Sequence, residues 1–164
     1  MTWDNATNYC GLLTTAERTA GRIPSTWAYR LPTEAEWEYG CRAGARTTRF
    51  GYGDDISDAA LVNYAWYSFN NSSTTHPVEQ KLANPWGLMD MHGNVWEWCQ
   101  DWHGTYPGGS ETDPQGPGTG SDRVARGGCW YDFASFCRSA FRYHFNPAGA
   151  RDSLGFRVVL APGQ

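Results

Sequence analysis

The chain has 164 residues, the length of one ordinary domain, and we expect a single domain over residues 1–164. Aromatic residues make up 15% of it and charged residues 18%, which excludes an intrinsically disordered chain and a simple helix bundle. The net charge is −4 and no basic stripe is present, so nucleic acid is not expected as a partner. No apolar run approaches the ~20 residues of a membrane-spanning helix. The first ten residues lack the basic and apolar regions of a signal peptide, and no compartment is predicted.

Two helices are predicted in the first third of the chain. Residues 4–20 place Ala6, Tyr9, Cys10, Leu13 and Ala16 at helical spacing. Residues 33–36 read TEAE, a capping box in which the first Thr and the last Glu each bond the other's backbone N–H. The second helix should therefore start there, carry Trp37 and Cys41, and end near Gly44.

Regular periodicity disappears beyond Gly44. Residues 104–122 form a Gly/Pro-rich stretch that is typical of a surface loop. Residues 123–131 predict a strand with a glycine break, and residues 155–161 predict a closing strand. Two helices followed by short strands and long loops indicate an α+β fold.

Five cysteines are widely spaced, and none forms a CxxC pair: Cys10, Cys41, Cys99, Cys129 and Cys137. The odd count and the spacing argue against a disulfide scaffold and a zinc ribbon. We expect buried, reduced thiols that pack as small hydrophobic groups. One or two disulfides remain the alternative.

The segment GNVWEW, residues 93–98, shows strand-like alternation. It places Trp96 and Trp98 on one face, and Val95 and Glu97 on the other. A carboxylate between tryptophans needs a partner, because an unpaired buried charge is costly. The partner of Glu97 is either a cation or an arginine, such as Arg126 or Arg157.

Five blocks occur together in a characteristic order: residues 29–44, 84–102, 123–130, 137–142 and 155–159. In this order they resemble the formylglycine-generating-enzyme, or sulfatase-modifying-factor, domain, a variant of the C-type lectin fold. The resemblance runs from about Thr2 to Val159. It implies two helices, short antiparallel strands and long structured loops. Members of that family usually have further strands before the first helix, and here we expect them to be absent.

The resemblance also implies structural Ca²⁺. One ion would be held by the Glu97 carboxylate and by carbonyls near Gly93, Asn94 and Val95. A second would use Asn63 and the carbonyl of Tyr64. Ca²⁺ takes several oxygen ligands, many from irregular loops. The arginines Arg126, Arg138, Arg142 and Arg157 are interpreted mainly as residues that fix loops.

Oxidases of the same family bind Cu(I) through two cysteines five residues apart. The matching positions here are Asp132 and Cys137, and a carboxylate is a poor ligand for Cu(I). We therefore expect neither copper nor catalysis. An oxidase that acts on a sulfatase cysteine, with altered metal chemistry at Cys137 and Cys129, is kept as an alternative.

The segment 131–154 is rich in irregularly spaced aromatic residues, which favours a solvent-facing cluster and a binding surface. It resembles the variable proteins of diversity-generating retroelements, in which mutagenised positions lie on a fixed C-type lectin scaffold. We predict a non-catalytic protein that binds a macromolecular ligand, chiefly a protein. The alternatives are that the aromatic residues fill a core, or that the chain is a calcium-dependent glycan-binding lectin. The predicted binding residues are Tyr131, Asp132, Phe133, Ser135, Phe136, Phe141, Tyr143, His144, Phe145, Asn146, Gly149, Asp152 and Ser153.

Overall fold

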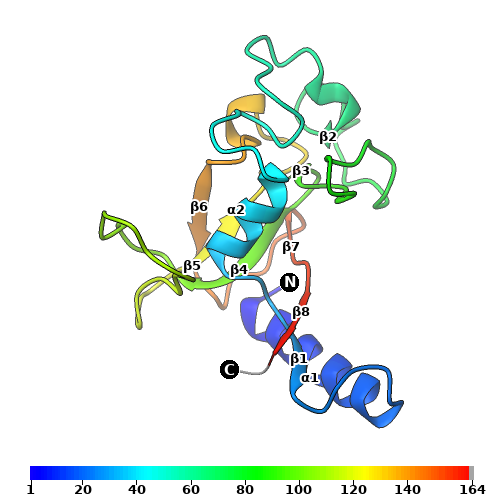
Figure 1. Cartoon of the computed structure of the whole chain (residues 1–164). Coiled ribbons are helices and arrows are strands. Elements are labelled where there is room, and N and C mark those ends of the chain that lie inside the picture. The colour runs from blue at the N-terminus through cyan, green and yellow to red at the C-terminus, as the bar shows by residue number, and fades with distance from the viewer. Residues whose placement is uncertain (163–164) are drawn as a thin grey trace.

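A computed structural model describes residues 1–162 of the chain, with a four-stranded sheet at its centre (Figure 1). The strand order is β6-β5-β4-β7, in which β4 pairs antiparallel with β5, β5 antiparallel with β6, and β4 parallel with β7. The strands are β4 (Trp96–Trp102), β5 (Arg123–Arg126), β6 (Arg142–Phe145) and β7 (Leu154–Gly155).

Two smaller sheets flank the central one. The pair of β1 (Trp27–Arg30) and β8 (Val159–Pro162) is antiparallel, whereas β2 (Ala65–Trp66) and β3 (His92–Gly93) run parallel. The expectation of antiparallel strands is therefore wrong for β2–β3 and for β4–β7. In both pairs a long segment connects the two strands. A short hairpin connection allows only antiparallel pairing, whereas a long connection also allows parallel pairing. The expected strand 155–161 is split, because the chain leaves β4 after Gly155 and pairs next with β1.

Helix α1 (Trp3–Thr19) confirms the first predicted helix, with a different buried face. The Thr2 hydroxyl accepts the N–H of Asn5 at its N-terminus. Ala6, Cys10 and Thr14 are buried, whereas the predicted Tyr9 is exposed. Thr14 is accommodated because its hydroxyl donates to the Cys10 carbonyl and accepts the Tyr29 N–H, both at 2.8 Å.

Helix α2 (Glu34–Arg42) begins with the predicted capping box. The Thr33 hydroxyl accepts the Glu36 N–H, and the Glu36 carboxylate accepts the Thr33 N–H. Trp37 and Cys41 are buried, as predicted, and the helix ends at Ala43 in the left-handed conformation. A short 3₁₀ turn, η1 (Leu61–Asn63), precedes β2.

The central sheet separates two hydrophobic clusters. On one side Trp96 and Trp98 pack with Ala6 and Cys10 of α1. On the other side Trp37 of α2 belongs to a cluster that also contains Cys41, Met91, Cys99 and Val124. The predicted alternation along β4 is confirmed, because the Trp96 and Trp98 side chains lie on the α1 side and Glu97 bonds Trp37 of α2.

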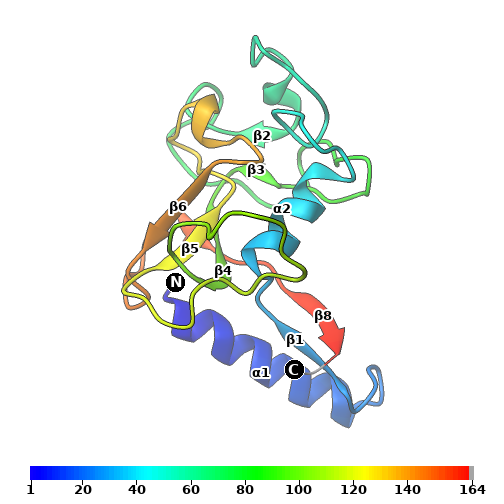
Figure 2. The same cartoon turned by 60° about the vertical axis from the view of Figure 1, so that its left-hand side comes forward.

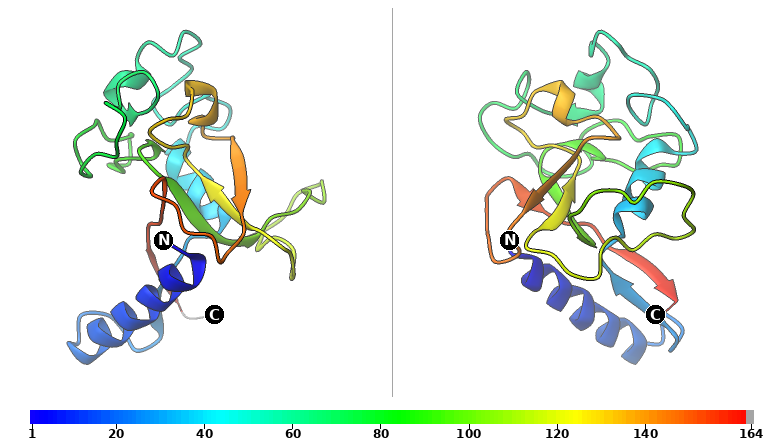
Figure 3. Two further views of the ribbon diagram at one scale, coloured as in Figure 1. Left: turned by 180° about the vertical axis from the view of Figure 1, so that it is seen from behind. Right: turned by 90° about the vertical axis from the view of Figure 1, so that its left-hand side faces the viewer.

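Helix α1 and the β1–β8 pair lie at one end of the molecule, and the loops between α2 and β3 lie at the other (Figures 2 and 3). Residues 104–122 contain no helix or strand and pass beside α2, as the sequence predicts. Within residues 1–162, no helix is both long enough and apolar enough to cross a membrane.

His92 of β3 is buried, and two backbone groups hold its ring. Its Nε2 lies 3.1 Å from the amide nitrogen of Gly51, and its Nδ1 lies 2.7 Å from the carbonyl oxygen of Cys137. Because the amide donates and the carbonyl accepts, the ring is neutral with its proton on Nδ1. Burial lowers the pKa of His92 from 6.5 to about 4. The stability that the neutral ring confers is complete above pH 6.5 and is lost as the pH falls towards 4.

We therefore expect the free energy of unfolding to fall by about 2 kcal/mol between neutral pH and pH 5 through this one group. Urea unfolding at a series of pH values measures it, and the His92→Gln variant is the control because its amide cannot be protonated in this range. The comparison cancels the opposite contribution of Asp101, whose pKa burial raises to about 6. Identical pH profiles of the two proteins would contradict this assignment.

Candidate functional site

The predicted binding residues come from three neighbouring segments around the edge strand β6. Residues 131–141 contain the 3₁₀ turn η2 (Ala134–Phe136), β6 follows, and residues 146–154 lead to β7. Backbone bonds fix the first segment at both ends: Ser68 donates its N–H to the Asp132 carbonyl at 2.9 Å, and Ser139 donates to the Arg49 carbonyl at 3.0 Å. An irregular segment is thus held in one conformation.

Three aromatic side chains of these segments face solvent. Phe133 is 71% exposed, Tyr131 47% and Tyr143 42%. Ser135, Asn146 and Asp152 are also exposed, and Gly149 is half-buried. We use the name aromatic surface for the exposed members of the predicted set: Tyr131, Phe133, Ser135, Tyr143, Asn146 and Asp152.

Phe136, Phe141 and Phe145 are half-buried and pack against the cluster that contains Trp96. The Trp96 ring centre lies 6.0 Å from that of Phe141 and 6.3 Å from that of Phe145. The alternative that the aromatic residues fill a core therefore applies in part to these three. Trp96, which the sequence marks only through the alternation of β4, forms the floor beneath Tyr143 at 5.4 Å between ring centres.

Three predicted binding residues make polar contacts within the protein, and we correct the assignment of the one that is buried, Ser153. Ser153 is buried, and its hydroxyl bonds the Tyr131 hydroxyl at 3.1 Å. The Asp132 carboxylate accepts the Cys129 N–H at 3.0 Å and so closes the turn. His144 bonds Asp122 at 2.9 Å on the opposite side of β6 from Tyr143, because side chains alternate along a strand.

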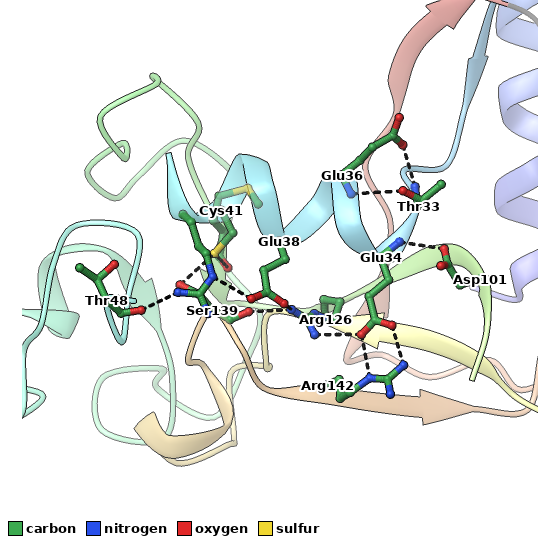
Figure 4. A network of polar contacts seen from close by, with 12 residues as sticks. Thr33, Glu34, Glu36, Glu38, Cys41, Thr48, Asp101, Arg126, Ser139 and Arg142 are labelled. Carbon is green, nitrogen blue, oxygen red and sulfur yellow. Dashed lines mark hydrogen bonds and ion pairs between the residues drawn. The ribbon is translucent and has the colours of Figure 1, made fainter. Parts of the chain in front are cut away.

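A buried network of charges fixes this region to α2 (Figure 4). Arg126 is completely buried and donates to Glu34 at 2.9 Å, to Glu38 and to the Ser139 carbonyl at 2.7 Å. Arg142 binds both oxygens of Glu34, at 2.9 and 2.6 Å. Arg126 and Arg142 thus fix loops, as the sequence predicts.

Arg138 and Arg157 also bond backbone carbonyls. Arg138 donates to the Ser135 carbonyl at 2.8 Å, and Arg157 to the Met89 carbonyl at 3.1 Å. Each guanidinium therefore holds a loop in place, in agreement with the sequence prediction.

All five cysteines are buried and free, which confirms the first expectation. Burial raises the pKa of Cys129 to about 12 and that of Cys137 well above 9. A buried thiol with a raised pKa is a poor nucleophile, because the thiolate is the reactive form. The geometry thus favours a structural role for both cysteines.

The Glu97 carboxylate is already hydrogen-bonded by two side chains. Arg157 donates to both carboxylate oxygens of Glu97, at 2.5 and 2.8 Å, and Trp37 Nε1 donates to one of them at 2.6 Å. The Asn94 side-chain oxygen accepts the His76 N–H. Of the two partners considered for Glu97, the structure shows the arginine. The cation site with Glu97, Gly93, Asn94 and Val95 stays a prediction. In residues 1–162 no three His, Cys, Asp or Glu side chains gather as metal ligands. The site at Asn63 and Tyr64 stays a prediction.

A family model described as the sulfatase-modifying factor enzyme 1-like domain matches residues 1–162. The formylglycine-generating enzyme of Streptomyces coelicolor is 39% identical over an alignment of 173 positions, gaps included. The alignment covers 97% of this chain and 51% of that protein. The serine/threonine-protein kinase pkn1 of Chlamydia caviae is 43% identical over 134 residues, which cover 79% of this chain and 21% of that protein.

Two solved structures are also similar. Treponema denticola variable protein 1 matches with a TM-score of 0.74 and 40% identity over 82% of this chain and 48% of that one. PvdO from Pseudomonas aeruginosa matches with a TM-score of 0.78 and 29% identity over 99% of this chain and 60% of that one. These likenesses confirm an α+β, C-type-lectin-like fold of the formylglycine-generating-enzyme subtype. The chain spans about half the length of the formylglycine-generating enzyme and about a fifth of the kinase.

Proposed function

We propose that this chain, which belongs to the sulfatase-modifying factor enzyme 1-like domain family, is a non-catalytic binding protein that displays a variable surface. The ligand would be a macromolecule, chiefly a protein, and the aromatic surface would contact it. The main support is that Phe133, Tyr131 and Tyr143 are exposed on segments whose backbone is hydrogen-bonded to the rest of the fold. The 40% identity to Treponema denticola variable protein 1 supports it.

The physical basis is that exposed residues would contact the ligand while their buried neighbours hold the scaffold in place. Exposed Tyr and Phe side chains offer large contact areas at low conformational-entropy cost, as they do in antibody paratopes. The half-buried Phe141 and Phe145 join these side chains to the core, and Arg126 fixes the loop beneath them. The exposed positions can therefore change identity while the scaffold remains folded.

Sequencing the coding block for residues 123–159 in many descendants of one strain tests the proposal. In the variable proteins of diversity-generating retroelements, adenines of a template are the mutagenised positions. We expect substitutions to concentrate at codons 131, 133, 135 and 143, and to spare Arg126, Trp130 and Cys137. The controls are Ile56 and Phe69, which are 85% and 79% exposed outside the block. Equal substitution at these controls, or an invariant block, would contradict the proposal.

A catalytic alternative is favoured by one observation, the 39% identity to a formylglycine-generating enzyme. Anaerobic titration with Cu(I) separates it from the binding role. We expect no tight stoichiometric complex, because Asp132 stands at one of the two ligand positions and a carboxylate is a poor ligand for Cu(I). A tight complex that is lost in the Cys137→Ser variant would favour the oxidase instead.

A further inference from the structure

A cavity lies on the α2 side of the sheet, and no residue of the aromatic surface lines it. Its volume is about 800 Å³, within the range of small-molecule sites. Its floor is formed by α2 and the end of β4, and residues 104–117 form its other wall. Arg142 is the β6 residue that lines it.

Aromatic rings and prolines form much of the wall. Trp102, Tyr106 and Tyr39 line the cavity together with Pro107, Pro114 and Pro117. A guanidinium stacks on one face of two of these rings. The Cζ atom of Arg123 lies 3.5 Å from the Trp102 ring centre, and that of Arg142 lies 4.1 Å from the Tyr106 ring centre. Aromatic faces of this kind attract cations through their quadrupole.

The charges of the lining also select a cation. Four carboxylates, those of Glu34, Glu38, Asp101 and Glu111, line the cavity, against the two guanidiniums of Arg42 and Arg142. Glu34 and Glu38 form ion pairs with Arg126 and Arg142. Among the acids that line the cavity, Asp101 is the buried one without an ion-pair partner in residues 1–162.

Asp101 is 5% exposed. One of its carboxylate oxygens accepts the Glu34 N–H at 2.7 Å, and no side chain within residues 1–162 donates to the other. Burial, with a smaller contribution from Glu34, raises its pKa to about 6. A charge that is buried without a counter-ion is costly, and a bound cation would remove that cost.

We propose that this cavity binds a small organic cation with a flat apolar body. The ammonium or guanidinium group would pair with Asp101, and the body would lie between the aromatic rings and prolines of the wall. The proposal is independent of the proposed function, because it uses a different surface.

Calorimetric titration with three indoles of similar shape tests the proposal. Tryptamine is a cation, indole-3-acetamide is neutral and indole-3-acetate is an anion. We expect tryptamine to bind at one site, the amide to bind at least about tenfold more weakly, and the acetate not to bind. Absence of saturable tryptamine binding, or equal affinity for the acetate, would overturn the proposal.

Two variants locate the site. In Asp101→Asn we expect the tryptamine affinity to fall at least about tenfold, and in Tyr106→Ala, which changes an exposed side chain of the wall, we expect a smaller loss. Phe69→Ala is the matched control, because Phe69 is an exposed aromatic residue remote from the cavity. Near-ultraviolet circular dichroism verifies that each variant is folded. Unchanged affinity in both folded variants, or a loss in the control, would overturn the proposal.

Discussion

Replacement of Arg126 by methionine should lower the free energy of unfolding by about 3–4 kcal/mol. Arg126 is completely buried and contacts the Glu34 and Glu38 carboxylates as well as the Ser139 carbonyl. Methionine fills a similar volume but leaves the two carboxylates with one guanidinium fewer. The expected loss lies at the lower end for a broken buried ion pair, because Glu34 keeps Arg142 and Glu38 keeps Arg42.

Urea unfolding of the wild type and the variant measures this loss. The control is Arg22→Met, which removes an ion pair between Arg22 and Glu17 whose guanidinium is mostly exposed, and which we expect to cost less than ~1 kcal/mol. If Arg126→Met does not fold, Arg126→Lys serves in its place, because it keeps the charge and loses the forked geometry. Equal stabilities of the Arg126 and Arg22 variants would contradict the role of the network.

The same network explains how an irregular segment can present a binding surface. The bond from Arg126 to the Ser139 carbonyl connects the segment 131–141 to the sheet, and Arg142 connects β6 to α2 through Glu34. A surface that tolerates changes at exposed positions needs such fixed points, because rigid presentation reduces the entropy that is lost on binding. We therefore expect variation around these arginines and not at them.

Local signals in the sequence predict the helices well. The capping box at Thr33 and Glu36 involves residues three apart, so the motif itself defines the start of α2. The buried face of α1 is less predictable, because the polar Thr14 is accommodated there by contacts with β1. Strand direction at β7 depends on where a long loop returns, which no local pattern encodes.

Local sequence patterns also fail to predict which single residues of the segment 131–154 are exposed. Composition identifies the segment 131–154, but burial within it depends on tertiary contacts. Phe141 and Phe145 pack on Trp96, which lies in the distant strand β4, whereas Phe133 has no such aromatic neighbour within residues 1–162 and is exposed. His144 turns away because β6 pairs with β5 in one particular register. Exposure and burial of these side chains therefore depend on tertiary contacts that no local sequence pattern encodes.

Replacement of Glu97 by glutamine should cost about 3 kcal/mol, because it removes the charge that compensates Arg157. Arg157 donates to both oxygens of Glu97, and its side chain is 25% exposed. Glutamine keeps the size and can still accept the N–H of Trp37 Nε1, so the loss reports the charge and not the packing. Thermal or urea unfolding of the two proteins measures it.

Calcium decides between the two interpretations of Glu97. If its partner is Arg157, the loss caused by Glu97→Gln is the same in excess calcium chloride and in excess chelator. If Glu97 binds calcium, the wild type is stabilised by the ion and the variant is not, so the difference between them is larger when calcium is present. Because the comparison is made between two proteins that share Asn63 and Tyr64, a calcium ion at that second position would stabilise both equally and cancel. We expect the difference to be independent of calcium, since the guanidinium already holds the carboxylate oxygens that the ion would need.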